Sequence, residues 1–232
     1  MTQLAPNLYQ ITLGAVNTFL IDSGDGLILI DAGYPDQAQS ILDAIRSFGK
    51  SPKDLRHILI THAHTDHIGS LATLQRETGA ETYVHSVDAG VTRGEGSGRA
   101  ILPAPGLFNQ LLFRFFIAPA LKMVSTIEPA EVSHEVNHGD VLPLAGDIEV
   151  IFTPGHSLGH VSYLWKQHGG VLFVGDAAAN FFALAPMIAY EDYPKGVVSL
   201  KKIAGYSFEM AGFGHGRAIK SGAAAQFRRK FA

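Results

Sequence analysis

Four side chains that can bind metal ions occur within six positions of the stretch THAHTDH, at His62, His64, Asp66 and His67. The first two directly follow the apolar run HILI, which predicts a buried strand. In extended chain, residues i and i+2 point to the same side, so both imidazoles can reach one ion. Asp66 and His67 stand where the chain turns into the next predicted helix, and they can face a second ion beside the first. The spacing therefore predicts a metal site at the end of this strand, because packing alone does not explain such a cluster.

A second histidine-containing stretch, HEVNH at residues 134–138, fits the pattern by which many metalloproteases hold zinc. That pattern works only on a helix, where two histidines four residues apart share one face. Here the surrounding residues are β-branched and rich in turn signals, and Gly139 follows directly. On a strand, residues i and i+4 lie about 13 Å apart, which is too far for one ion. We therefore expect His134 and His138 to be surface or strand-end residues, and we do not expect a protease of this type.

The elements that must position the metal-binding cluster alternate between strands and helices. LYQITL, VNTFLID and LILI predict strands, and LILI ends at Asp31. Apolar residues at helical spacing predict a helix that runs from Pro35 to a stop at Gly49. The second half repeats this character, with IEVIFT, HVSYLW and VLFVG as strands and helices around 197–203 and 223–229. Two strand-rich halves, each flanked by helices, predict two stacked sheets with helices outside.

Composition and charge narrow the function classes. The 232 residues, of which 47% are hydrophobic, can form one large core, and no linker or low-complexity segment divides them. A net charge of −3 gives no basic surface for nucleic acid or for an anionic membrane. Cysteine is absent, which excludes disulfides, thiolate ligands and a cysteine nucleophile, and the first ten residues do not resemble a signal peptide. We therefore expect a cytoplasmic protein with a single domain over residues 1–232 and no nucleic-acid partner.

The metal-binding cluster resembles the H-x-H-x-D-H signature of the metallo-β-lactamase superfamily, and similar blocks follow in the order typical of that family. TPGHSLGH offers His156, LFVGDA offers Asp176, and GFGHG offers His215. LIDAG resembles the early block of the family, with Asp31 in a supporting role near the site. The resemblance covers nearly the whole chain. It implies a fold of mixed α/β (α+β) class. This is the four-layer αββα sandwich known as the metallo-β-lactamase fold.

The resemblance also implies two divalent metal ions, with zinc favoured and iron or manganese as the alternatives. Three histidines would hold the first ion, two histidines and an aspartate the second, and a further aspartate would bridge both. The ligands are His62, His64 and His156 for the first ion, Asp66, His67 and His215 for the second, and Asp176 for the bridge. A hydroxide shared by ions about 3.5–4 Å apart would be the nucleophile, because metal binding lowers the pKa of water to about 7. Asp66 is the catalytic candidate that would accept or relay a proton.

For the reaction, the resemblance implies a metal-dependent hydrolase that acts on a small ester, lactone or thioester with an apolar portion. A phosphodiesterase or phosphotriesterase is the alternative, because the same hydroxide can attack phosphorus; an iron-dependent oxidoreductase of the same fold is a further one. Asp176 stands where common zinc β-lactamases carry a cysteine ligand, so we do not expect a β-lactam substrate. Ala179 stands where acyl-homoserine lactonases commonly carry a tyrosine that contacts the substrate, so the chain departs from that pattern.

An apolar helical insert at about residues 99–129 separates the two halves. Its apolar residues recur at helical spacing and predict a wide apolar face. They are Leu107, Phe108, Leu111, Leu112, Phe115 and Phe116. The run is too short and too interrupted for a membrane span. Extra core, a homodimer surface, a lid over the metal cleft and an interfacial membrane anchor are the alternatives for this segment.

Overall fold

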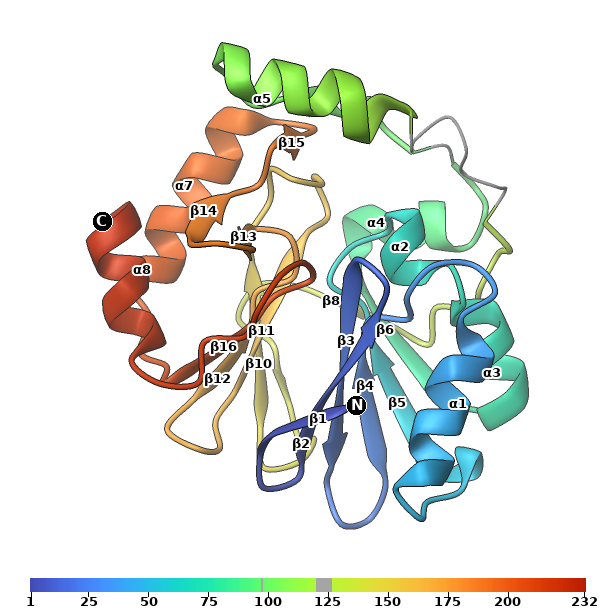
Figure 1. The fold of residues 1–232 in the computed structure, drawn as a ribbon. Helices are drawn as coiled ribbons and strands as arrows, with labels where there is room; N and C mark the ends of the chain where they lie inside the picture. Colours follow the sequence, from blue (N-terminus) through green and yellow to red (C-terminus); the bar gives the residue numbers. More distant parts are fainter. Residues whose placement is uncertain (97, 120–126) are drawn as a thin grey trace.

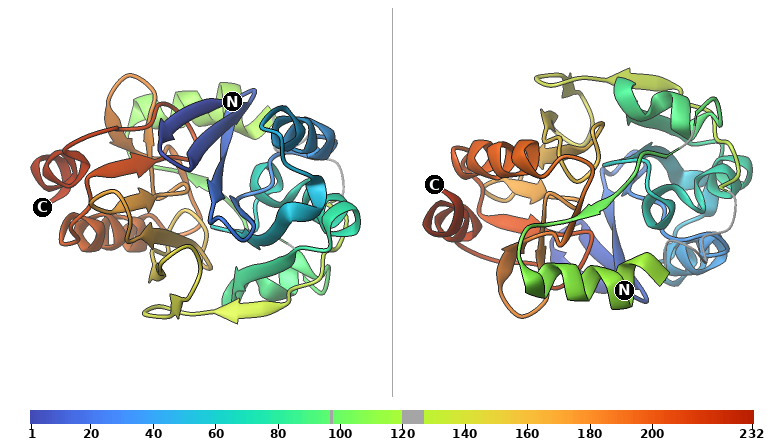
Figure 2. Two further views of the ribbon diagram at one scale, coloured as in Figure 1. Left: turned by 90° about the horizontal axis from the view of Figure 1, so that it is seen from below. Right: turned by 90° about the horizontal axis from the view of Figure 1, so that it is seen from above.

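Two β-sheets stack face to face at the centre of the molecule, and helices lie on both outer sides (Figure 1). The computed structural model describes residues 1–96, 98–119 and 127–232. The views from below and from above show the same succession of helix, sheet, sheet and helix (Figure 2). The predicted four-layer αββα sandwich is therefore confirmed.

The N-terminal sheet has the strand order β1-β2-β3-β4-β5-β6-β8. In that order its strands span Thr2–Ala5, Leu8–Leu13, Val16–Asp22, Leu27–Ile30, Leu55–Leu59, Glu81–His85 and His134–Val136. The pairs from β1 to β4 are antiparallel, and those from β4 to β8 are parallel. The helical elements of this half are α1 (Ala38–Ser47), the 3-10 turn η1 (Pro52–Asp54), α2 (Thr65–Ile68), α3 (Leu71–Thr78) and α4 (Ser86–Thr92).

The second sheet has the order β16-β12-β11-β10-β9. In that order its strands span Met210–Gly212, Val171–Phe173, Val161–Trp165, Ile148–Phe152 and Val141–Leu142. Its outer helices are α7 (Tyr193–Ala204) and α8 (Ala223–Phe231). A separate two-stranded ribbon pairs β13 (Ala178–Asn180) with β14 (Leu184–Pro186).

Three apolar layers hold the sandwich together, and the sequence of β4 shows how they arise. Side chains on a strand point alternately to its two faces. Leu27 and Leu29 therefore pack against α1 and α3, whereas Ile28 and Ile30 pack into the layer between the two sheets. The third layer lies between the second sheet and α7 and α8. Each alternate position of β4 thus serves a different core, which is why the whole strand is apolar.

The predicted helix after β4 begins later than expected. The sequence predicts a start at Pro35, but α1 begins at Ala38. The reason is local: Asp36 has a φ of 64°, in the left-handed region, which a right-handed helix does not contain. Its predicted end is confirmed, because Gly49 has a φ of 79° and directly follows Phe48, the last residue of the helical pattern.

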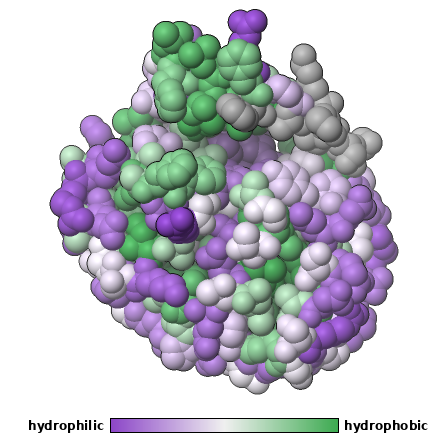
Figure 3. Space-filling view, in the orientation of Figure 1, coloured by the Kyte–Doolittle hydropathy of each residue, from purple (hydrophilic) through white to green (hydrophobic). Residues whose placement is uncertain are grey.

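The described part of the insert lies at the end of the sandwich, where it spans both halves (Figures 1 and 2). β7 (Leu102–Pro103) pairs with β15 (Ala189–Tyr190), and α5 (Leu107–Leu112) continues into a π-helical turn at Phe113–Ile117. No residue of α5 is buried, and Phe108 and Phe115 are 73% and 64% exposed. Apolar residues accordingly cluster over α5 on the molecular surface (Figure 3). The alternative of extra core is therefore wrong for α5, although Ala104 beside β7 is buried; residues 120–126 lie outside the described residues.

Two further expectations concern HEVNH and membranes. His134 lies on β8, and its Nε2 is 3.2 Å from Glu81 Oε2, while His138 follows the strand. The stretch is therefore not the helix that the protease pattern requires. None of the helices in the described part of the chain combines the length and apolar character that crossing a membrane requires.

Candidate metal centre

The first four predicted ligands lie on the segment that joins β5 to α2. β5 ends at Leu59, and His62 and His64 follow; at His64 the backbone is extended, with φ −82° and ψ 154°. α2 begins one residue later, so Asp66 and His67 stand in its single turn. The backbone N–H of His67 donates to the carbonyl of His64 over 2.9 Å and fixes this turn. The buried strand therefore delivers two histidines, and the turn that follows delivers the next two side chains.

The other three predicted ligands come from the second sheet. β10 and β12 are both antiparallel to β11, and β16 is parallel to β12, so these three strands end at the same edge. His156, Asp176 and His215 follow β10, β12 and β16 respectively. Gly214 leaves room for the cluster, because a Cβ at that position would come within 2.2 Å of Asp176 Oδ1.

The structure brings all seven predicted side chains together in adjoining groups. Ligand atoms lie within 4.8 Å of one another in each of the groups His62, His64 and His156; Asp66, His67 and His215; and His62, His67 and Asp176. His64 Nδ1 is 2.9 Å from His156 Nε2, and His215 Nε2 is 3.2 Å from Asp66 Oδ2. Asp176 Oδ2 is 3.4 Å from His156 Nε2 and 3.2 Å from His215 Nε2. One carboxylate therefore reaches both halves of the cluster.

Unpaired buried atoms in the cluster test whether it fits metal ions. The Nε2 atoms of His62, His64 and His67 and the Oδ1 atom of Asp176 have no hydrogen-bond partner among the described residues. Buried polar atoms of proteins are nearly always paired, so four such atoms in one place call for a ligand. Imidazole nitrogens and carboxylate oxygens are the donors that zinc and related divalent cations take. The side chains present therefore fit such cations.

Hydrogen bonds on the far side of the imidazole rings orient them. The Nδ1 atoms of His156 and His215 donate to the backbone carbonyls of Ala189 and Ala15, each over 2.8 Å. His67 Nδ1 lies 2.9 Å from a buried carboxylate. Such contacts place the proton on one ring nitrogen and leave the other free for a metal ion. These three rings are therefore held with Nε2 toward the cluster.

The carboxylate beside His67 belongs to Asp31, which links both halves of the cluster. It is 2% exposed and accepts hydrogen bonds from Thr61 through the backbone N–H (2.8 Å) and the hydroxyl (2.8 Å). The Thr61 hydroxyl is in turn 3.0 Å from His62 Nδ1. Asp31 thus orients His67 directly and His62 through Thr61, as expected for a residue with a supporting role.

The charges of the cluster stabilise one another. Burial opposes ionisation of Asp66, but His67 and His215 outweigh it and hold the pKa of this carboxyl well below its usual value. Burial lowers the pKa of His215, but Asp176 and Asp66 outweigh it and raise that pKa well above the usual value. For His156 burial dominates and lowers the pKa to about 4. In the metal-free protein Asp66 and His215 are therefore both charged, whereas His156 is a neutral imidazole.

A buried acid that no motif of the sequence indicates faces the cluster. Glu191 Oε1 is 3.9 Å from His64 Nε2, and Glu191 Oε2 accepts from the backbone N–H of Leu158 over 2.7 Å. Arg99, at the base of the insert, is 3.4 Å from the same carboxylate. The insert is thus joined to the ligand segments through an acid that the sequence analysis missed.

Asp88 is a second buried acid that the sequence does not indicate. It is 2% exposed and accepts from the backbone N–H of Ala63 (3.0 Å) and from the Ser157 hydroxyl (2.8 Å). Arg99 Nη1 is 3.2 Å from its other oxygen. Asp88 therefore ties the His62–His64 segment to the segment that carries His156. Only the tertiary fold brings these partners together, so no spacing in the sequence could have revealed them.

Two histidines near the cluster have structural partners. His160 Nε2 accepts from the backbone N–H of Asp176 over 2.9 Å, and its Nδ1 is 2.8 Å from the Thr153 hydroxyl. His85 ends β6 and stacks on Phe152 with ring centroids 4.3 Å apart. These residues support the fold around the site and are not among the grouped ligand atoms.

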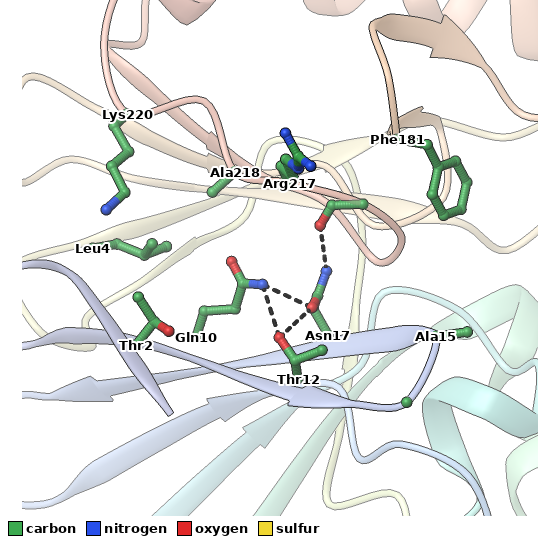
Figure 4. Close-up of a pocket in the computed structure, with 12 residues that line it drawn as sticks. Thr2, Leu4, Gln10, Thr12, Ala15, Asn17, Phe181, Arg217, Ala218 and Lys220 are labelled. Carbon is green, nitrogen blue, oxygen red and sulfur yellow. Dashed lines mark hydrogen bonds between the residues drawn. The ribbon is translucent and has the colours of Figure 1, made fainter.

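A groove of about 570 Å³, drawn in Figure 4, is lined by residues that contact His215. Ala15, whose carbonyl accepts from His215, lies at its edge together with Gly216. The ring of Phe181 also lines it and stacks against His215 with centroids 6.3 Å apart. The groove therefore begins beside a predicted metal ligand and extends away from the cluster.

Comparison with protein families and known sequences finds similarity over most of the chain. A model of the metallo-beta-lactamase superfamily matches residues 11–210. The chain is 28% identical over 230 residues to Bacillus subtilis YobT, covering 92% of this chain and 90% of that protein. It is 27% identical over 188 residues to the probable metallo-hydrolase YflN of the same organism, covering 75% and 65%. It is 25% identical over 220 residues to the thioesterase pkgB of Emericella nidulans, covering 93% of this chain but 50% of that protein.

Solved structures show the same fold. The chain resembles a B3 metallo-beta-lactamase with an active-site glutamic acid, with a TM-score of 0.70 and 24% identity over 96% of this chain and 85% of that one. It resembles the MIM-2 metallo-beta-lactamase with a TM-score of 0.71 and 23% identity, covering 97% and 84%. At this identity the likeness establishes the architecture alone.

Proposed function

The chain belongs to the metallo-beta-lactamase superfamily of metal-dependent hydrolases, and we propose that it cleaves a small ester, lactone or thioester with an apolar portion. The observation that carries the proposal is the position of Asp176, whose carboxylate lies between two groups of ligand atoms. The similarity to a protein named as a thioesterase supports a carboxylic substrate.

We propose that the cluster holds two divalent cations, with zinc favoured because neutral imidazole and carboxylate ligands suit it. The ligands would be His62, His64 and His156 for the first, Asp66, His67 and His215 for the second, and Asp176 for both. When bound, the cations would polarise the substrate carbonyl and lower the pKa of water to about 7, so that a nucleophile forms at neutral pH. Asp176 would offset the repulsion between the two cations.

Asp66 is the residue that we propose for proton transfer. Its side chain is 19% exposed, whereas that of Asp176 is 3% exposed. Of the two carboxylates in the cluster, Asp66 is therefore the one that water and substrate can reach. Its Oδ2 lies 3.2 Å from His215 Nε2, which holds the carboxylate in place. From this position it would accept a proton from the attacking water and relay it to the leaving group.

The proposal that the substrate has an apolar portion rests on the exposed apolar side chains of α5 and of the turn that follows it. Leu107, Phe108 and Phe115 are exposed at the end of the sandwich, where the loops that carry the ligands also lie (Figure 1). A substrate with an aliphatic tail would cover part of this surface. Burying each methylene of such a tail gains up to about 0.8 kcal/mol, which is roughly fourfold in affinity.

The test is a series of acyl esters, thioesters and lactones of increasing chain length, with phosphodiesters and phosphotriesters in parallel. Activity on the carboxylic series should increase with chain length, and Phe108→Ser with Phe115→Ser should flatten this dependence while zinc content stays unchanged. Val141→Ser, which removes an exposed apolar side chain of β9, is the matched control. Cleavage of phosphoesters alone would overturn the proposed substrate class. If the changed face were a dimer surface, light scattering would show monomers and the chain-length dependence would remain.

A further inference from the structure

We propose that the groove beside His215 binds an anionic oxygen group, a carboxylate or a phosphate, at the end of the substrate remote from the bond that is cleaved. This inference rests on the proposed function for its reaction, but not for the binding itself. Its basis is the charge of the groove walls. Arg217 and Lys220 line the groove, whereas exposed apolar side chains lie over α5.

The groove lies between the β2–β3 hairpin and the segment that follows His215. In Figure 4 the residues of the hairpin and of β1 form one wall, and Arg217, Ala218 and Lys220 form the other. Phe181 and Ala15, which both contact His215, lie at one end, and Lys220 lies at the opposite end beside Leu4. A ligand that lies along the groove would therefore have one end beside the metal-binding cluster and the other beside Lys220.

The charge of the walls has one sign. Arg217 and Lys220 line the groove, and none of the twelve lining residues is acidic. Neither cation takes part in an ion pair with another described residue. In Figure 4 the ammonium of Lys220 extends toward Leu4, and Arg217 stands between Lys220 and Phe181. Two uncompensated cations along one groove attract an anion, and guanidinium binds carboxylate or phosphate oxygens in pairs.

Three of the four neutral polar residues of the groove, Gln10, Thr12 and Asn17, already hydrogen-bond to one another or to backbone carbonyls. Gln10 Nε2 donates to Asn17 Oδ1 (2.7 Å) and to Thr12 Oγ1 (3.1 Å). Thr12 donates to the same Asn17 oxygen over 2.9 Å. Asn17 Nδ2 donates to the carbonyls of Phe213 and Gly216. The side-chain donors of these three residues are therefore used, and Arg217 and Lys220 supply the charged donors that are left for a ligand.

The backbone that carries Arg217 is fixed. Its N–H donates to the carbonyl of Asn180 and its carbonyl accepts from Asn180 Nδ2, each over 2.8 Å. Gly216 has a φ of 94°, and a Cβ there would meet the Asn180 backbone at 2.4 Å, so only glycine allows this approach. The backbone of Arg217 is thus held at a defined position two residues beyond a predicted metal ligand, and its exposed side chain extends from that point.

The test compares matched ligands that need no turnover. The probes are N-phenylhexanamide, the mono-N-phenylamide of adipic acid, and the corresponding phosphonate, titrated calorimetrically into zinc-loaded protein. We expect each anionic probe to bind about five- to tenfold more tightly than the neutral one, as two exposed cations together provide. The advantage should shrink as the salt concentration increases from about 0.05 to 0.5 M. The ratio between the two anionic probes shows which oxygen group the groove prefers.

Arg217→Gln with Lys220→Gln should bring the ratio of anionic to neutral affinity close to one. The matched control is Arg56→Gln with Lys53→Gln, which removes the same charge from exposed residues outside the groove and should keep the ratio. Equal affinities in the unchanged protein, an equal loss in both double variants, or a ratio that persists in Arg217→Gln with Lys220→Gln, as direct binding of the anion to zinc would give, would overturn the proposal. If the protein hydrolysed no ester, the proposed function would be wrong. The ratio of anionic to neutral affinity would still show whether the groove binds an anion.

Discussion

Replacing Asp31 by asparagine should weaken zinc binding without unfolding the protein. The carboxylate accepts from the Thr61 backbone N–H, from the Thr61 hydroxyl and from His67 Nδ1, all at 2.8–2.9 Å. An asparagine has one acceptor oxygen. If that oxygen stays with the Thr61 N–H, the amide nitrogen faces His67 Nδ1 and cannot accept its proton. The proton then moves to Nε2, the atom that the second cation needs.

The magnitude follows from the interactions lost. A hydrogen bond to a charged group contributes about 1.5–3 kcal/mol, and the loss of such a partner of a metal-binding histidine lowers metal affinity about 10–100-fold. Asp31→Asn should therefore reduce the affinity for the second ion by that factor, measured by competition with a chromophoric chelator. The first ion should be affected less, because Asp31 reaches His62 only through Thr61.

Asp36→Asn is the matched control for this prediction. Asp36 also has a φ in the left-handed region, at 64° against 63° for Asp31, and asparagine tolerates that region. Unlike Asp31, Asp36 makes no side-chain hydrogen bond to a predicted ligand or to Thr61 among the described residues, so the same chemical change there should leave zinc binding unaltered. Urea unfolding of the chelator-treated proteins shows whether the variants fold. A folded Asp31→Asn protein that holds both ions as tightly as the unchanged one would show that Asp31 does not keep His67 Nε2 free for a metal ion.

Three further predictions concern HEVNH, the release of protons on zinc binding, and Asp88. His134→Ala with His138→Ala should leave zinc content and activity unchanged, because neither residue belongs to the grouped ligand atoms. Loss of zinc would show that HEVNH binds the metal after all. Zinc uptake near pH 7 should release protons, and the affinity for the second ion should increase with pH. Burial lowers the pKa of His67 and of His215, but the neighbouring carboxylates raise both well above the usual value, so these rings must lose a proton to bind. Calorimetry in buffers of different ionisation enthalpy measures the release, and uptake without protons would contradict it. Asp88→Ala should lower the free energy of unfolding by about 2–4 kcal/mol, because it leaves the Ala63 N–H and the Ser157 hydroxyl without partners. Urea unfolding measures this change. An unchanged midpoint of the urea transition would show that Asp88 does not hold the ligand segments.

Much of the sandwich and its ligand cluster could be predicted because the signals are local. LILI predicts a strand buried on both faces, and β4 spans those four residues with alternate side chains in two different cores. The spacing of His62 and His64 after a strand places both on one side, and the structure confirms that they lie together. Periodicity and spacing act over a few residues, so the sequence alone displays them.

The remainder depends on contacts that the sequence does not display. Asp88 and Glu191 acquire their roles only when the segments around His62 and His156 meet Arg99. The helical periodicity of the insert predicts an apolar face but cannot tell whether another element covers it. In the structure Phe108 stays exposed, and so the alternative of extra core fails there.

The most direct test of the two-ion cluster is a crystal structure of the zinc-loaded protein with anomalous scattering measured at the zinc edge. We predict two peaks about 3.5–4 Å apart, with Asp176 in contact with both. The first should lie against His62 and His156 and the second against Asp66 and His215. A single peak, or a peak at HEVNH, would contradict the account.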